Sequence, residues 1–199
     1  MRKFFTTATI GATAVLALTA ATPAWSANTT AISDVAPILA TAQTASDLPP
    51  AVVDLGAIGG IDADTVRSLG SDEIASYWIG QTSNSDICLI THIRGGNEVA
   101  SSSCRTIPEF NLMGLGLITG EGSDDPSRSA EAYYLPSDIS LSEIGAPVQA
   151  DVNGRASTDG AFTSGRPGSL DLDEADVKRA DGSTFRFQPL SLPGEKAAS

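Results

Sequence analysis

The chain has 199 residues, a length that suits one domain or at most two small ones. It carries 24 acidic and 12 basic side chains, a formal net charge of −12, and loss of a basic leader would make this balance more negative. Such a chain is repelled by phosphate backbones, so nucleic-acid binding and docking on anionic membranes are excluded. One histidine and two cysteines are too few ligands for a haem, zinc-cluster or iron–sulfur protein, so no cofactor is expected.

Residues 1–26 predict a secretory signal peptide. Arg2 and Lys3 form a basic head, an apolar stretch spans residues 4–21, and small residues follow. Cleavage is expected after one of three residues: Ala24, Ser26 or Ala27. The alternative is an uncleaved membrane anchor, because the apolar stretch is almost long enough to span a bilayer. Its threonines and its small-residue exit favour cleavage. We therefore expect a mature protein that is secreted or held in the cell envelope, without stable membrane insertion.

Residues 27–60 predict a flexible linker, because they are rich in Ala, Thr, Ser and Pro and show no steady hydrophobic period. The one element expected there is a weak helix over residues 35–42. A compact β-rich domain is expected from residue 61 to residue 146.

At the start of this domain, Asp62 or Asp64 is expected to cap a short helical turn that runs through Leu69 and ends at Gly70. A strand over residues 65–67 is the alternative.

The rest of the domain predicts short strands separated by clusters of turn-forming residues. The expected strands span residues 75–82, 87–94, 98–106, 115–121 and 129–135. A short helix is expected over residues 107–114, because Pro108 suits its first turn and Gly114 its end. The fold class is therefore mainly β or α+β, a small antiparallel meander of about five strands with one or two short helices and disordered flanks.

The C-terminal part has two predicted regions. Residues 147–182 contain few apolar side chains and predict a polar segment of low order. Residues 183–199 predict a C-terminal edge strand and a tail, because Phe185 and Phe187 alternate with polar neighbours.

Two cysteines in an exported chain predict a disulfide. If residues 95–97 form a three-residue hairpin loop, Arg94 lies opposite Glu98, and Cys88 lies directly opposite Cys104 on the neighbouring strand. Opposed residues in a non-hydrogen-bonded antiparallel pair bring their Cα atoms within the range that a disulfide requires. A redox-active pair is the rival interpretation, but fifteen intervening residues do not resemble a CxxC motif.

His92 is the only candidate imidazole base. A weak serine-type hydrolase would join it to one of the serines at 101–103 and to an acid such as Asp86. No GxSxG or SxxK motif is present. The predicted register places His92 on the same face as Arg94 and the disulfide, which we expect to be the more solvated face. A solvated sheet histidine is therefore the favoured interpretation.

Two acidic clusters are weak candidates for calcium, which is bound by six to eight oxygen atoms. The first comprises Glu121, Asp124 and Asp125, and the second comprises Asp171, Asp173, Glu174 and Asp176. Solvated turns are the more usual role of such clusters, so no metal is expected.

Two aromatic side chains are candidates for contact with a ligand. Strand alternation leaves Trp78 or Tyr133 on an open face, where an aromatic ring can grip a sugar or a partner surface. The alternative, partial burial under the strand that contains Phe185 and Phe187, is the favoured interpretation.

A set of short motifs carries a resemblance. In chain order they are Tyr77-Trp78-Ile79-Gly80, Ile87-Cys88-Leu89-Ile90, Ser103-Cys104, Phe110, Gly114-Leu115 and Ala132-Tyr133-Tyr134-Leu135-Pro136. Over roughly residues 65–138 the chain is similar to small exported proteins of unknown function from high-GC Gram-positive bacteria. The resemblance implies an exported, disulfide-bearing domain, and it implies no catalytic residue.

Together these features predict a secreted or envelope-associated, non-catalytic binding module for an unknown extracellular or cell-surface partner. The alternatives are the hydrolase that uses His92 and a protease inhibitor that presents the loop 95–98.

Overall fold

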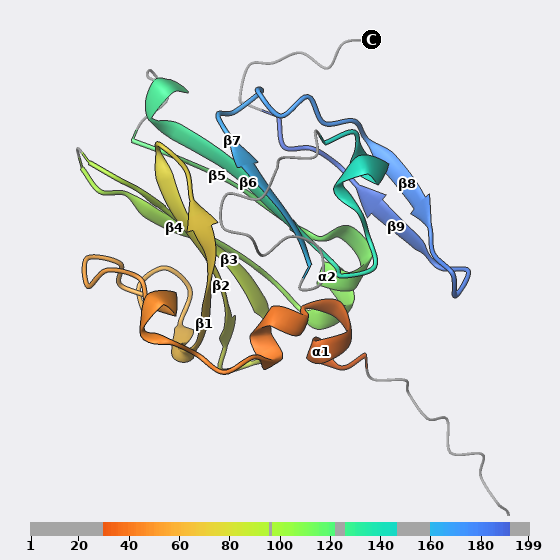
Figure 1. Cartoon of the computed structure of the whole chain (residues 1–199), viewed down its shortest axis with the longest axis horizontal. Coiled ribbons are helices and arrows are strands. Elements are labelled where there is room, and N and C mark those ends of the chain that lie inside the picture. The colour runs from red at the N-terminus through yellow and green to blue at the C-terminus, as the bar shows by residue number, and fades with distance from the viewer. Residues whose placement is uncertain (1–29, 96, 122–125, 147–159, 192–199) are drawn as a thin grey trace, which may run out of the picture.

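The computed structural model describes residues 30–95, 97–121, 126–146 and 160–191, which form nine strands in antiparallel sheets and two short α-helices (Figure 1). The predicted mainly-β class is confirmed. The predicted signal peptide lies outside the described residues. Among those that are described, no helix is long and apolar enough to cross a membrane.

The first sheet has four strands in the order β1-β2-β3-β4. They span Ile61–Ser71, Ala75–Thr82, Ile87–Ile93 and Ala100–Arg105. The strands predicted for β2, β3 and β4 are confirmed, and all pairs are antiparallel neighbours in sequence order, as in a meander.

The helical turn predicted between Asp62 and Gly70 is wrong, because this segment is strand β1. The alternative of a strand around residue 66 is the one observed. The ladder is interrupted between Asp62 and Arg67, where β1 bulges against β2. Asp62 Oδ1 does accept a hydrogen bond from Asp64 N, at 3.1 Å, but this contact belongs to the bulge rather than to a helix. Gly80 of β2 leaves the space that the bulge needs, since a Cβ atom there would lie 2.9 Å from Ile61 Cγ2.

The second sheet has three strands in the order β5-β6-β7, spanning Leu115–Gly120, Ser129–Leu135 and Ala161–Gly165. The two sheets are joined by the predicted helix, α2 (Ile107–Met113). Thr106 and Glu109 form a capping box at its start, and Gly114 ends it with a φ of 68°.

A separate hairpin, β8 (Ala175–Lys178) and β9 (Thr184–Phe187), lies beyond the second sheet (Figure 1). The predicted C-terminal strand is present, but it pairs with β8 and does not join the main meander. The prediction of low order for residues 147–182 is wrong for β7 and β8. Residues 147–159 lie outside the described part of the chain.

Arg179, directly after β8, connects this hairpin to the rest of the protein. Its guanidinium donates to Asn111 Oδ1 of α2 at 2.7 Å, approaches Asp138 Oδ2 to 3.1 Å and lies over the Phe185 ring. The hairpin is therefore held by directed contacts as well as by apolar packing.

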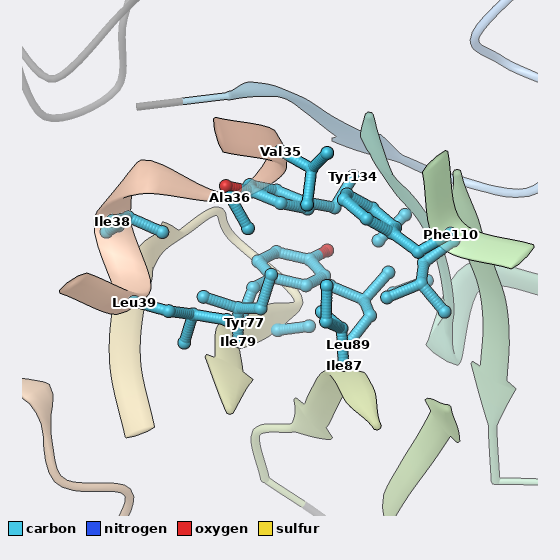
Figure 2. Close-up of a cluster of buried hydrophobic side chains, with 14 of the residues drawn as sticks. Val35, Ala36, Ile38, Leu39, Tyr77, Ile79, Ile87, Leu89, Phe110 and Tyr134 are labelled. Atoms are coloured by element: carbon cyan, nitrogen blue, oxygen red, sulfur yellow. The ribbon is translucent and has the colours of Figure 1, made fainter. Parts of the chain in front are cut away.

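Three apolar clusters stack through the molecule. The main cluster fills the space between the two sheets and includes Tyr77, Leu89 and Tyr134 (Figure 2). A second cluster lies between the outer face of the second sheet and the β8–β9 hairpin, and a third covers the outer face of the first sheet. Each sheet thus has apolar side chains packed against both of its faces, although β4 at the edge of the first sheet is only partly buried. This double cover was not predicted from the sequence.

The N-terminal segment belongs to this core, so the prediction of a flexible linker over residues 27–60 is wrong for much of it. The helix expected over 35–42 is replaced by α1 (Ile32–Val35) and a 3-10 turn (Pro37–Ala40), and Ile38 and Leu39 are buried in the main cluster. Figure 2 shows these side chains closing one end of the space between the sheets. Three further 3-10 turns span Ala45–Asp47, Pro126–Arg128 and Leu141–Ile144.

Residues 41–47 also cover the free edge of β1. Gln43 Nε2 donates to the carbonyl oxygens of Ala63 and Val66, and Asp47 Oδ1 accepts from Ser68 N at 3.0 Å. Thr41 O accepts from the buried Arg67 side chain. Side chains of this segment therefore satisfy backbone groups that a neighbouring strand would otherwise pair.

Hydrogen bonds to the Asp72 carboxylate connect the two sheets at their edge. Asp72, between β1 and β2, accepts hydrogen bonds from the Ile74 and Ala75 amides at 2.8 Å each. Its Oδ2 accepts from the Tyr77 hydroxyl at 2.6 Å and from the Ser164 hydroxyl of β7 at 3.1 Å. Burial acts to raise the pKa of Asp72, but these four hydrogen bonds outweigh it and hold the pKa below its ordinary value of 3.8.

Replacement of Gly116 by alanine is expected to lower the free energy of unfolding by about 1–3 kcal/mol through overpacking. A Cβ atom at this position in β5 would lie 2.8 Å from Cε1 of the fully buried Tyr133. Urea denaturation measures the change. Gly56→Ala is the control, because its Cβ would meet only the end of the exposed Asp54 side chain, at 3.3 Å. Equal stability of the two variants would contradict the close approach.

Candidate functional site

The predicted disulfide is confirmed. Cys88 and Cys104 face each other across β3 and β4, with their Cα atoms 4.0 Å apart and their sulfur atoms bonded. The predicted register holds from Ile87 to His92, which pairs with Ala100. The strands end sooner than predicted, so the connecting loop is longer than three residues.

On the face that carries the disulfide and His92, strand β3 is buried, so the prediction of a more solvated face is wrong for His92, although Cys104 of the neighbouring strand β4 is exposed. His92 is 4% exposed and Cys88 is completely buried. The cover is supplied by apolar side chains of the loop before β1 and of β1 itself, namely Val53, Leu55, Ile58, Ile61 and Val66. Three of these side chains, Val53, Leu55 and Ile58, come from the predicted linker over residues 27–60.

The residues proposed for a hydrolase do not come together. The serines at 101 and 103 point to the opposite face from His92, because they alternate with residues 100, 102 and 104 along β4. Ser102 shares the face of His92, but its hydroxyl donates to the carbonyl oxygen of Ile58. Asp86 precedes β3 and lies six residues from His92, roughly 20 Å along an extended strand. The arrangement contains no accessible base beside a free nucleophile.

The loop 95–98 is tightly turned. Gly95 and Glu98 have φ angles of 78° and 50°. Asn97 N donates to Glu121 Oε1 at 3.1 Å, which fixes the loop to the end of β5. Gly96 lies outside the described residues. A curled loop of this kind does not present the extended backbone that adds to a partner's sheet edge, so it gives the inhibitor hypothesis no support.

Neither candidate aromatic is on an open face. Trp78 is 5% exposed and Tyr133 is 1% exposed. Trp78 packs in the apolar cover over the first sheet. Tyr133 lies under the β8–β9 hairpin with its ring centroid 5.2 Å from that of Phe187, so the alternative of burial under the C-terminal strand is the one observed.

The calcium candidates fall in different surroundings. Asp124 and Asp125 lie outside the described residues. Glu121 forms an ion pair with Arg128 at 2.8 Å. Asp171 and Asp173 lie in the segment before β8, and Asp176 lies in β8 opposite Arg186. Among the residues that the structure does describe, no group of three or more His, Cys, Asp or Glu side chains gathers at one point.

The strongest candidate site is a pocket of about 150 Å³ on the outer face of the second sheet. Its floor includes Glu131 of the central strand β6, and its walls come from the loop after β7 and from the C-terminal segment. The lining residues are Glu131, Gly168, Leu170, Asp171, Leu172, Pro189 and Leu190.

Hydrogen bonds hold the Glu131 carboxylate in place. Oε1 accepts from the Tyr133 hydroxyl, and Oε2 accepts from Gly168 N at 3.0 Å. The same Tyr133 hydroxyl accepts from Leu190 N at 2.7 Å. Glu131 and Tyr133 share a face of β6 because they are two residues apart, so one short chain of hydrogen bonds joins the floor of the pocket to both walls.

A glycine lets the wall of the pocket approach the sheet. Gly165 lies opposite Glu131 in β7, and a Cβ atom there would lie 2.8 Å from Leu170 Cδ2. The loop that follows can therefore place Leu170 and the Gly168 amide directly over β6. Beside this loop, Asp171 is exposed and has a φ of 47°, a left-handed conformation in which Asp and Asn are better tolerated than most residues.

The pocket contains a buried carboxylate that has no ion-pair partner among the described residues. Glu131 is 4% exposed, and within the described part of the chain no Lys or Arg side chain forms an ion pair with it. Buried charges are normally paired with an opposite charge, because two neutral donors offset only part of the cost of removing a carboxylate from water. Burial and the hydrogen bond to Glu131 raise the pKa of Tyr133, so Tyr133 stays protonated and remains a donor at neutral pH.

The charged side chains among the lining residues are the carboxylates of Glu131 and Asp171, which attract a cation and repel an anion. Glu131 is not among the site residues predicted from the sequence. The available signal was a glutamate between two alanines, Ala130 and Ala132, in a strand that ends in Tyr133-Tyr134-Leu135. No family model, curated protein or solved structure matches the chain.

Proposed function

We propose that the protein is an exported, non-catalytic binding module that holds a positively charged group in the Glu131 pocket. The observation that carries this proposal is a buried carboxylate that opens on a pocket and lacks a basic partner in the described part of the chain. A ligand cation would supply the missing charge, whereas an anion would be repelled.

Other features support the export and the absence of catalysis. The signal-like leader, the single disulfide and the resemblance to exported proteins all favour a role outside the cytoplasm. The burial of His92 and the engagement of Ser102 favour binding over hydrolysis. The net charge of −12 favours a basic partner.

We expect a partner captured from the cell surface by the immobilised mature protein to be lost when Glu131 is replaced by glutamine. The substitution removes the negative charge that attracts the partner but keeps the size of the side chain. Quantitative mass spectrometry of the captured material measures the loss. Glu73→Gln is the matched control, because Glu73 is exposed and lies outside the pocket.

Circular dichroism and a thermal midpoint must show that both variants are folded. His92→Ala should retain the partner if the protein binds without catalysis. Retention of the same partner by folded Glu131→Gln would exclude the pocket as the binding site.

A further inference from the structure

We infer that the group held by the Glu131 pocket is the guanidinium of an arginine side chain presented by a partner protein. This inference rests on the proposed binding function of the pocket and names its ligand. Four properties of the pocket carry it: its volume, its walls, its two carboxylates and the spare hydrogen-bond acceptors of Glu131.

The volume limits the ligand to a single small group. Pockets for drug-sized ligands measure roughly 300–1,000 Å³, whereas this one measures about 150 Å³. An enclosed apolar cavity of about that size holds one benzene molecule. A planar guanidinium with its adjoining methylene is of similar size, so the remainder of the ligand must lie outside the pocket, on the protein surface.

The walls suit the aliphatic stem of a long basic side chain. Leu170, Leu172, Pro189 and Leu190 supply apolar surface between the mouth and the floor. Leu190 is 41% exposed, so this surface continues out of the pocket. Arginine buries its methylenes along apolar surface and places its charge at the end of the side chain. This matches a pocket that has leucine and proline side chains in its walls and a carboxylate at its floor.

The two carboxylates favour guanidinium over a metal ion. Glu131 at the floor and Asp171 in the lining are the only acidic side chains among the pocket residues. Calcium requires six to eight oxygen ligands, and the pocket residues supply only two carboxylates. Guanidinium is planar, carries five N–H donors and is more weakly hydrated than ammonium. Its transfer from water into a partly buried site therefore costs less hydration free energy than the transfer of an ammonium group.

Each oxygen of Glu131 has spare acceptor capacity for these donors. Oε1 and Oε2 each accept one hydrogen bond within the protein, from Tyr133 and Gly168, and each has a second lone pair. The carboxylate is fixed before the ligand arrives, so binding does not require it to be ordered. The Gly168 and Leu190 amides report directly on its occupancy, because both belong to the same hydrogen-bonded chain.

The test is a titration of the ¹⁵N-labelled mature protein with N-acetyl-arginine methylamide, followed through the Gly168 and Leu190 amide resonances. We expect saturable shifts with a Kd on the order of 1 mM. N-acetyl-citrulline methylamide, which has the same shape without the charge, should bind at least tenfold more weakly. The lysine analogue should bind more weakly than arginine.

Two variants separate the ligand site from the fold. Glu131→Gln is expected to weaken binding of the arginine probe by at least tenfold. Asp171→Asn should weaken it by roughly threefold while leaving stability unchanged, because Asn tolerates the same left-handed backbone. Glu73→Gln should bind as the unaltered protein does.

Several outcomes would overturn the inference. They are equal shifts with citrulline, tighter binding of the lysine analogue, tighter binding of calcium at the same amides, or no shift with arginine at tens of millimolar. If the arginine probe does not bind while capture of a partner still depends on Glu131, the guanidinium is rejected as the ligand and the proposed binding function is retained. If neither result depends on Glu131, both proposals fall.

Discussion

Reduction of the Cys88–Cys104 disulfide is expected to lower the free energy of unfolding by about 3 kcal/mol. The bond closes a loop with a sequence separation of 16, and breaking it returns that conformational freedom to the unfolded chain. Small domains have total stabilities of about 5–15 kcal/mol, so this is one of the largest single contributions available to the fold. Chemical denaturation of the oxidised and reduced protein, monitored by tryptophan fluorescence, measures the difference.

The same bond should be reduced slowly while the protein is folded. Cys104 is exposed, but Cys88 lies among apolar side chains and is completely buried. Attack on Cys104 would leave a thiolate at Cys88 in apolar surroundings, which is an unfavourable place for a charge. Reduction in dithiothreitol should therefore accelerate strongly when denaturant opens the structure. A reduction rate that is independent of denaturant would contradict this account, and so would unchanged stability of the reduced protein.

Replacement of Asp72 by alanine is expected to cost about 2–3 kcal/mol of stability at neutral pH. The change removes the acceptor of four hydrogen bonds, including those from the fully buried Tyr77 and from Ser164 of the opposite sheet. Asp54→Ala is the control, because the Asp54 side chain accepts one hydrogen bond, from Ala57 N, in an exposed turn. Urea denaturation at pH 7 measures both variants.

The effect of Asp72→Ala should also depend on pH. Because the folded pKa lies below the ordinary value of 3.8, the carboxylate contributes its full stabilisation above that value. The contribution is lost as the pH falls from about 3.8 through the folded pKa. The stability difference between the two proteins should therefore be constant from pH 5 to 7 and should narrow in acid. A difference that persists unchanged well below pH 3 would show that the carboxylate charge is not involved.

The elements predicted correctly from the sequence are those whose start and end are marked by residues within or next to the element. Strands β2 and β3 are bracketed by turn-forming residues, and the register of β3 and β4 follows from counting across their hairpin. The disulfide follows from the same count. Helix α2 has Pro108 in its first turn and Gly114 at its end, so its bounds are also present in neighbouring residues.

The elements that it misses depend on contacts between distant segments. Strand β1 contains a bulge that hides its alternation and is stabilised by pairing with β2. Strand β7 is polar, and its Thr163 is buried because it pairs with Tyr133 of β6. The burial of Trp78 depends on a cover from residues 53–66. The pocket is harder still to predict, because Glu131 bonds to Gly168 across 37 positions of sequence and Tyr133 bonds to Leu190 across 57.

The segment over residues 41–47 has a consequence for the behaviour of the protein at high concentration. It occupies the edge of β1 with side-chain hydrogen bonds and, through Ile38 and Leu39 just before it, closes the main apolar cluster. A protease that cut between this segment and β1 would release an uncapped strand beside newly wetted apolar side chains. Such an edge is a template for intermolecular pairing, so trimming the N-terminus would promote aggregation.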